Sequence, residues 1–235
     1  MADEAGAPGL AALLLVADGR FPAGSHAHSG GLEAAVSAKQ VWDTRSLEGF
    51  LRGRVATSGA TTAAFTAAAC AGAGRGPGLP ARIIELDAEF GARTPAPALR
   101  DTSRRLGRQL LRASRAVRPD PRLDALAGAL PEGPHQPVVL GVTAAVLGLT
   151  PGAAAAAALH EAAAGPATAA VRLLGLDPYA VHSVLARLAP ALDDLAVAAT
   201  ALADAPPAEL PAYGAPLLDV SAEVHAAWEV RLFAS

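Results

Sequence analysis

The segment Phe21–Glu33, with the sequence FPAGSHAHSGGLE, holds the side chains best suited to chemistry. His26 and His28 stand two residues apart, and in an extended loop both imidazole rings would lie on one side. Such a pair can hold Ni²⁺, Zn²⁺ or Cu²⁺ if a third ligand comes from elsewhere. His160 and Glu161 are candidates for that ligand, but HEAAA lacks the second histidine of the zinc-protease helix motif. Histidines at this spacing are commonly loop or capping residues, so a structural or partner-contact role is favoured over permanent metal ligation.

The other chemistry-bearing residues do not support a nucleophilic enzyme. HSGG resembles a small oxyanion-type loop, but the chain has no Gly-x-Ser-x-Gly elbow. Cys70, the single cysteine, lies in an alanine-rich apolar segment, where thiols are usually inert. In the cluster of Glu85, Asp87 and Glu89, the first and last share a helical face while Asp87 points away, and a solvated face is expected. An interaction protein is therefore favoured, and a soluble metal-binding helical enzyme that uses the histidine pair is the alternative.

The composition excludes disorder and gives no support to nucleic-acid or membrane binding. Hydrophobic residues make up 52% and charged residues 17% of the 235 residues, and the formal net charge is −3. The N-terminal sequence MADEAGAPG is acidic, so a signal peptide is not expected. The longest uncharged run, residues 136–159, contains two prolines and three glycines, which favours buried helix over a membrane span. We expect a cytoplasmic protein.

Helical periodicity dominates the chain, and no segment alternates convincingly with a period of two. The chain is predicted to be all-α, with residues 1–235 forming a single-domain helical bundle of roughly eight to ten helices. Residues 1–8 are expected to be a flexible N-terminus, and residues 206–235 a Pro-rich break followed by an exposed C-terminal tail. The expected helices cover residues 10–17, 29–36, a segment from 44 or 46 to beyond 55, 99–117, 137–147, 151–174 and 181–202.

Individual residues predict where several helices begin, bend or are interrupted. Ser29 is a candidate N-cap for the second helix, and Thr44 or Ser46 for the third. Gly59 is expected to bend the third helix. The stretch 119–134 is expected to be a loop with one short turn.

Four arginines follow one face of the helix expected over residues 99–117. They are Arg104, Arg108, Arg112 and Arg115, opposite an apolar face of Leu106, Leu110, Ala113 and Val117. A solvated surface is favoured for this basic stripe, and a contact with an acidic protein partner comes second. Nucleic acid comes third, because the chain is acidic overall and the stripe has no interleaved aromatic residues.

Phe21–Glu33 also resembles the N-terminal signature of the urease accessory protein F family. In that family Pro-x-Gly is followed by an aromatic residue, Ser or Ala, His or Tyr, Ser, and then Gly-Leu-Glu. Further segments similar to the family follow in order: ELDA from Glu85, SRRLGRQLL from Ser103, HQPVV from His135, AAVRL from Ala169 and the terminal RLFAS from Arg231. The chain departs from the family pattern at His26, where an aromatic residue is usual, and after Arg172, where the usual Pro-Leu-Gly-Gln run is missing.

The resemblance implies a dimer-forming, cytoplasmic, all-helical protein with no enzymatic activity and no cofactor of its own. It would bind the D-type (also called H-type) accessory protein and the G-type GTPase, in an assembly that inserts nickel into apo-urease. Nickel would be cargo in transit, and GTP would be bound by the partner. The partner-binding residues that the resemblance suggests are Pro22, Gly24, His28, Ser29, Gly31, Glu33, His135, Arg172, His225, Trp228, Arg231, Leu232 and Phe233.

Two interpretations give these residues roles. The tail, Pro216–Ser235, would dock as a helix on the D-type partner, with Trp228, Leu232 and Phe233 as anchors, because buried aromatic residues dominate such contacts. The Gly24–Glu33 loop would face the GTPase or border a path for nickel, and a purely structural corner is an equal alternative for its glycines.

Overall fold

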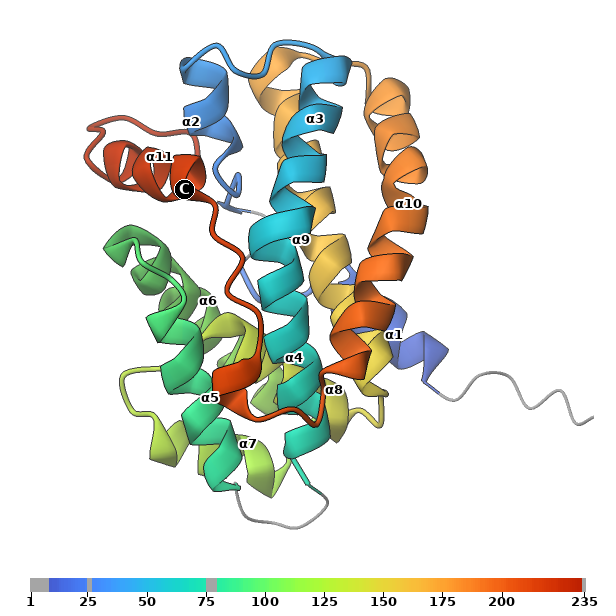
Figure 1. Cartoon of the computed structure of the whole chain (residues 1–235), viewed down its shortest axis with the longest axis vertical. Helices are drawn as coiled ribbons and strands as arrows, with labels where there is room; N and C mark the ends of the chain where they lie inside the picture. Colours follow the sequence, from blue (N-terminus) through green and yellow to red (C-terminus); the bar gives the residue numbers. More distant parts are fainter. Residues whose placement is uncertain (1–8, 25–26, 75–79, 234–235) are drawn as a thin grey trace, which may run out of the picture.

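The structure is a computed structural model, described for residues 9–24, 27–74 and 80–233. These residues form α-helices joined by short connections, and the described part of the chain contains no strand (Figure 1). The predicted all-α bundle is confirmed. The expected flexible N-terminus, residues 1–8, lies outside the described residues, as does His26. No helix in the described ranges is both long and apolar enough to cross a membrane.

Three helices make the centre of the molecule: α4 (Ala60–Gly72), α8 (Gln136–Val146) and α9 (Pro151–Leu174). Ten of the thirteen residues of α4 are buried, and most of them are alanines. Small side chains let helices approach closely. A methyl group at Gly141 of α8 would overlap the Thr66 carbonyl oxygen of α4 and lie 2.8 Å from the Cys70 nitrogen. The core of this chain therefore depends on close backbone approach, because it has few large side chains to fill space.

Outer helices cover this centre. α10 (Pro178–Ala201) packs on α9 and α4, and α6 (Pro97–Val117) packs on α8. α1 (Leu10–Ala17) lies against α9, and α5 (Ala81–Ala92) against α4. The helices expected over residues 10–17, 99–117, 137–147, 151–174 and 181–202 are thus present within two to three residues of the expected ends. Val117, expected on the apolar face of α6, is instead 49% exposed, because it is the last residue of that helix.

The third helix is capped and bent differently from the expectation. α3 (Thr44–Arg54) is capped by Asp43, whose carboxylate accepts a 2.8 Å hydrogen bond from the Ser46 amide. The Ser46 hydroxyl accepts one of 3.0 Å from the Asp43 amide, so the two residues form a capping box. Thr44 and Ser46 are therefore inside the helix, and neither is its N-cap. The bend expected near Gly59 is a π-turn, η2 (Val55–Gly59), that joins α3 to α4.

The prediction of a loop over residues 119–134 is wrong. Residues Pro121–Ala129 form α7. Asp120 caps this helix by accepting a 2.9 Å hydrogen bond from the Arg122 amide, and Pro121 stands at the first helical position, where its missing N–H costs nothing. Leu123 and Leu126 are fully buried, which fixes α7 to the core.

The C-terminal segment follows the surface of the body, and most of its described residues are exposed, as expected of the tail. After α10 the chain makes a short 3₁₀ turn, η3 (Pro207–Glu209), and then runs along α4 to α11 (Pro216–Ala226), as Figure 1 shows. α11 packs against α6 and against α2 (Leu32–Ser37). The following residues return to the body, and Phe233 is only 6% exposed.

Candidate docking site where the Gly-rich loop meets the C-terminal tail

The carboxylate of Glu33 joins the N-terminal loop to the chain end. Glu33 lies in the first turn of α2 and is 8% exposed. It accepts hydrogen bonds from the Leu232 amide at 2.8 Å and the Phe233 amide at 3.0 Å, and His225 Nε2 lies 2.9 Å from it. Burial raises the pKa of Glu33, but the two amides and the His225 ring outweigh burial and hold this pKa below its usual range. Glu33 is therefore a buried anion that fixes the tail.

Glycines shape the loop that presents Glu33. Gly30 and Gly31 have positive φ angles of 59° and 89°, which a residue with a side chain adopts only at a cost. α2 begins at Leu32 with Gly31 as N-cap, two residues later than an N-cap at Ser29 would place it. The hydroxyl of Ser29 still accepts a 3.2 Å hydrogen bond from the Glu33 amide, so the polar side chain caps the helix from upstream. Gly31 also leaves room for Leu218 of α11, which would lie 3.1 Å from a methyl group there.

Gly24 has a packing role. Its φ is 81°, and a methyl group there would overlap the side-chain amide of Gln109 on α6. Pro22 is exposed at the surface beside it, and His28 is half-buried at the rim of a cavity. His26 lies outside the described residues, so the metal-binding pair of His26 and His28 stays a prediction. Among the described residues, no group of three or more His, Cys, Asp or Glu side chains is placed to hold a metal ion.

His135 lies deep in the molecule, far from any surface contact. It is fully buried, and its backbone amide donates a 2.6 Å hydrogen bond to Asp87 of α5. Its Nδ1 lies 3.1 Å from the Ser103 hydroxyl of α6. Burial, and then the positive charges of Arg104 and Arg100, lower the pKa of His135 to about 3, so the ring is neutral.

Glu85 is exposed and Glu89 is half-buried, as expected of a solvated face, whereas Asp87, which points away from them, is buried in the interior. It is 2% exposed and accepts a 3.1 Å hydrogen bond from Arg104. Burial raises the pKa of Asp87, while the His135 amide and Arg104 act in the opposite direction. The spacing of the buried residues of α5 carries the signal that was missed, because 83, 86, 87 and 90 all fall on one helical face.

The basic stripe of α6 is partly used inside the molecule. Arg104 also donates a 2.6 Å hydrogen bond to the Gly133 carbonyl, and Arg108 donates one of 2.7 Å to the Glu132 carbonyl. Arg115 pairs with Asp124 of α7 at 2.7 Å. Three of the four arginines therefore hold the chain around α7 to α6, a role that the expected solvated surface did not include.

The tail residues split between the interior and the surface. Phe233 lies in a core cluster with residues of α2, α3, α9 and α10, and the Arg172 guanidinium lies 5.3 Å from its ring centre. The Trp228 ring lies 4.7 Å from the buried His225 ring and is itself half-buried. Leu232 is 75% exposed, and Arg231 is also exposed. Of the three expected anchors, Leu232 faces solvent and Phe233 faces the core of its own chain.

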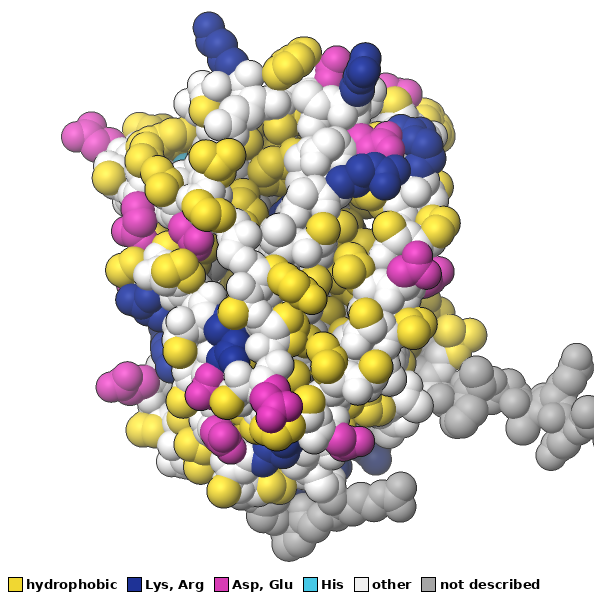
Figure 2. All heavy atoms as spheres, viewed as in Figure 1, with side chains coloured by type: hydrophobic (Ala, Val, Ile, Leu, Met, Phe, Trp, Pro, Cys, Tyr) yellow, Lys and Arg dark blue, Asp and Glu magenta, His cyan; other side chains and the backbone are white. Residues whose placement is uncertain are grey.

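The outer face of α11 carries an apolar stripe. Leu217, Val220 and Val224 are 73%, 63% and 54% exposed, and their spacing puts them on one side of the helix. Figure 2 shows hydrophobic side chains gathered on the surface over α11. We call these three side chains the α11 stripe. The opposite side of the same helix holds Ala222 and His225, which are buried.

Two cavities lie beneath these surfaces. The first has a volume of about 230 Å³ and lies between α11, the Gly-rich loop, α6 and α9, with Arg54 among its lining residues. The second, of about 350 Å³, lies beside the segment that follows α1. Both are lined by Gln136 and Glu161, which are joined by a 2.8 Å hydrogen bond. Burial lowers the pKa of Arg54 to about 10, and the negative charge of Glu161 opposes that shift.

These features define an all-helical protein in which exposed apolar side chains stand on a corner held by buried polar contacts. The sequence profile of the UreF family matches residues 41–189. The urease accessory protein UreF of Mycobacterium sp. (strain JLS) is 43% identical over 226 residues, which cover 96% of this chain and 99% of that protein. UreF of Mycolicibacterium vanbaalenii is 42% identical over 228 residues, which cover 96% of this chain and 99% of that protein. UreF of Mycobacterium tuberculosis (strain H37Rv) is 40% identical over 217 residues, which cover 92% of this chain and 94% of that protein.

The chain therefore belongs to the UreF family of urease accessory proteins, which confirms the resemblance seen in its motifs. Its relatives are named as accessory proteins, and the chain is accordingly an accessory protein and not an enzyme.

Proposed function

We propose that this chain is a scaffold for nickel insertion into apo-urease. It binds the D/H-type accessory protein and the G-type GTPase at once, and it modulates the GTP-dependent action of the latter. It works as a homodimer in the cytoplasm, nickel is its cargo, and GTP is bound by the partner. The observation that carries this proposal is the corner where Glu33 fixes the chain end, since the exposed Leu232 and the α11 stripe belong to the segment that it holds.

The D/H-type partner docks on the tail and on the α11 stripe. Leu232, at 75% exposed, and the α11 stripe are apolar side chains that lose contact with water when a partner covers them. Trp228 is half-buried beside them, which suits a residue at the centre of an interface. Phe233 and His225 act from inside by holding the tail in one shape, so that little ordering is needed at the moment of binding.

The Gly-rich loop faces the GTPase or borders the path of nickel. His28 and Glu161 line the first cavity, and imidazole and carboxylate groups suit a transition metal in passage. Pro22 is exposed on the same loop and is available to a protein partner. The glycines themselves have structural reasons to be there, as Gly24 and Gly31 show.

The test is co-expression of this chain with urease and the other accessory proteins, followed by measurement of the nickel content of the purified urease. We expect Val220→Glu with Leu217→Glu to abolish co-purification with the D/H-type protein and to reduce the nickel content of urease strongly, because two buried charges would oppose docking. Val197→Glu is the matched control, since Val197 is 72% exposed on α10. Unchanged capture by the double variant would contradict the assignment of this surface.

A further inference from the structure

The C-terminal segment forms one side of the first cavity. We call residues 203–233 the strap. Tyr213, Leu218, Ala222 and His225 of the strap line one side of the cavity, and Arg54 is among the residues of the body that line it. The strap is therefore part of the cavity wall, and any movement of it changes access to the interior.

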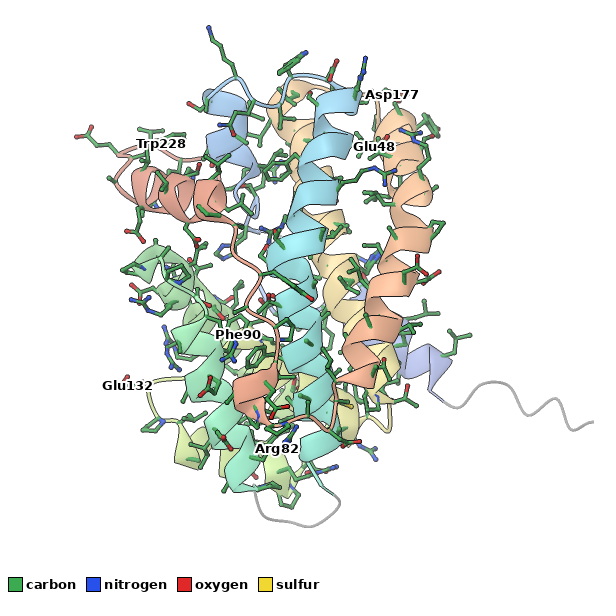
Figure 3. The ribbon with its side chains drawn as sticks, viewed as in Figure 1. Glu48, Arg82, Phe90, Glu132, Asp177 and Trp228 are labelled. Carbon is green, nitrogen blue, oxygen red and sulfur yellow. The ribbon has the colours of Figure 1, made fainter. Side chains whose placement is uncertain are left out.

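The first part of the strap is fixed by Arg82 of α5 and by Arg93, the C-cap residue of the same helix. The guanidinium of Arg82 donates hydrogen bonds of 3.1 and 2.6 Å to the carbonyls of Ala203 and Ala205. Arg93 donates to the carbonyls of Pro207 at 3.3 Å, Ala208 at 2.8 Å and Leu210 at 3.2 Å. Figure 3 shows Arg82 at the end of the molecule where η3 lies. These bonds hold residues 203–210 to the body along their backbone.

The second part of the strap is held by few contacts. α11 buries only Ala222 and His225 among its residues, whereas α4 buries ten. Its polar ties are the Glu33 carboxylate and a 2.8 Å hydrogen bond from the Ala98 amide to Glu223. A segment with so little buried apolar surface opens at a lower free energy than the core does. The three contacts of Glu33 and the buried ring of Phe233 therefore carry most of the attachment.

A short irregular segment separates the two parts. Residues 211–215 form no helix, and Ala212, Tyr213 and Gly214 are exposed. A methyl group at Gly214 would meet nothing closer than 4.0 Å, so the backbone there has space to rotate. The described contact of this segment with the body is a 3.2 Å hydrogen bond from the Tyr213 amide to the Thr61 hydroxyl.

We infer that residues 216–233 are a lid, that residues 211–215 are its hinge, and that Glu33 is the latch that holds the lid shut over the first cavity. When the lid opens, residues 203–210 stay fixed by Arg82 and Arg93, and Arg54, Gln136 and Glu161, which are half-buried when it is shut, become more exposed to polar solutes. This inference goes beyond the scaffold role, and its test needs no partner protein.

The first experiment is native-state amide hydrogen exchange on the full chain. The amides of α11 with those of Leu232 and Phe233 are expected to exchange as one group, faster than the amides of α4. Glu33→Gln, which keeps the shape and removes the charge, is expected to speed this group by about 10- to 100-fold, as the loss of one or two charge-assisted hydrogen bonds requires. Exchange of α4 should not change. Glu48→Gln is the control, because Glu48 pairs with Arg52 and Arg187 outside the strap.

Two results of the exchange experiment would contradict the inference that residues 216–233 are a lid. One is exchange of the α11 amides in step with α4 in the unaltered protein. The other is equal acceleration of both helices by Glu33→Gln, which means that the substitution only weakens the whole fold.

A thiol placed in the cavity tests the opening directly. Ala158 lines the cavity and is 3% exposed, and the native thiol of Cys70 is a slow background because burial raises its pKa to about 11. The labelling rate of Ala158→Cys by a small thiol reagent should rise with Glu33→Gln by the same factor as the α11 exchange. If the amides speed up while labelling does not, the chain end frays without uncovering the cavity, and the lid is wrong.

Discussion

His135 should make the protein sensitive to mild acid through its own protonation. The ring is fully buried, and its Nε2 faces Phe90 and Gly91 with no hydrogen-bond partner among the described residues. A protonated ring would need an acceptor at both nitrogens, and only Ser103 lies beside the other one, Nδ1. Protonation in the folded state is therefore costly, which agrees with a pKa of about 3.

The sign and size of the effect follow from proton linkage. The pKa of His135 is lowered on folding from 6.5 to about 3, so between these values the unfolded chain binds one proton more than the folded one. The contribution of this group to stability is complete above pH 6.5 and is lost as the pH falls. Each pH unit is worth about 1.4 kcal/mol, so the free energy of unfolding should fall by about 2 kcal/mol between pH 6.5 and pH 5.

Urea unfolding at pH 7 and pH 5 measures this loss, and a variant isolates it. His135→Asn does not titrate, and its side-chain amide can reach the Ser103 hydroxyl from the position of ring Nδ1. The variant is expected to be less stable than the unaltered protein at pH 7, but to lose about 2 kcal/mol less on going to pH 5. Asp87 titrates in both proteins, because its partner is the backbone amide of residue 135.

His182→Asn is the control, since His182 lies exposed on α10. Equal pH dependence of the unaltered protein and His135→Asn would refute the reasoning. It would mean that the buried ring accepts a proton without opposing the fold.

Three further measurements test the packing. Gly141→Ala should lower the free energy of unfolding, measured in urea, by about 1–3 kcal/mol, because its methyl group meets the backbone of α4. Gly128→Ala, which has open space around it, should raise the free energy of unfolding by up to ~1 kcal/mol in the same assay. Phe233→Ala should cost about 3 kcal/mol in the same assay, while Leu232→Ala should stay within ~0.5 kcal/mol, and equal losses would contradict the inward placement of Phe233. Cys70 should resist thiol reagents at pH 8 until urea unfolds the chain, because burial raises its pKa to about 11; rapid labelling of the folded protein would contradict that burial.

The long helices were predictable from the sequence because their apolar residues recur at the helical period and these same residues are the buried ones. The segments 137–147 and 151–174 are mostly apolar and each begins with a proline, and α8 and α9 lie there. α7 was missed for the opposite reason. Its nine residues include only two fully buried leucines, and the Pro, Asp and Gly around it are also what a loop would contain. Here the tertiary environment decides, since burial of Leu123 and Leu126 stabilises a helix that is too short to be stable alone.

The candidate site was harder to predict, because its contacts join residues far apart in the chain. The Glu33 carboxylate and the Leu232 amide are separated by 199 positions, and no local pattern reports such a pairing. The sequence signalled that the loop and the tail were each unusual. It did not signal that they touch. A buried glutamate in a first helical turn needs partners, and that requirement is visible only once burial is known.

The family-like segments gain a physical meaning from their pairing. ELDA, SRRLGRQLL and HQPVV meet where Asp87, Ser103 and Arg104 surround His135. GLE and RLFAS meet at Glu33, and AAVRL joins them through Arg172 on the Phe233 ring. Six segments thus reduce to two buried polar clusters, each of which ties elements that are distant in the chain. The residues inside these clusters set the shape of the surface, and direct contact with a partner falls to their exposed neighbours, such as Leu232 and the α11 stripe. A substitution inside a cluster should therefore change stability and binding together, whereas one on the exposed neighbours should change binding alone.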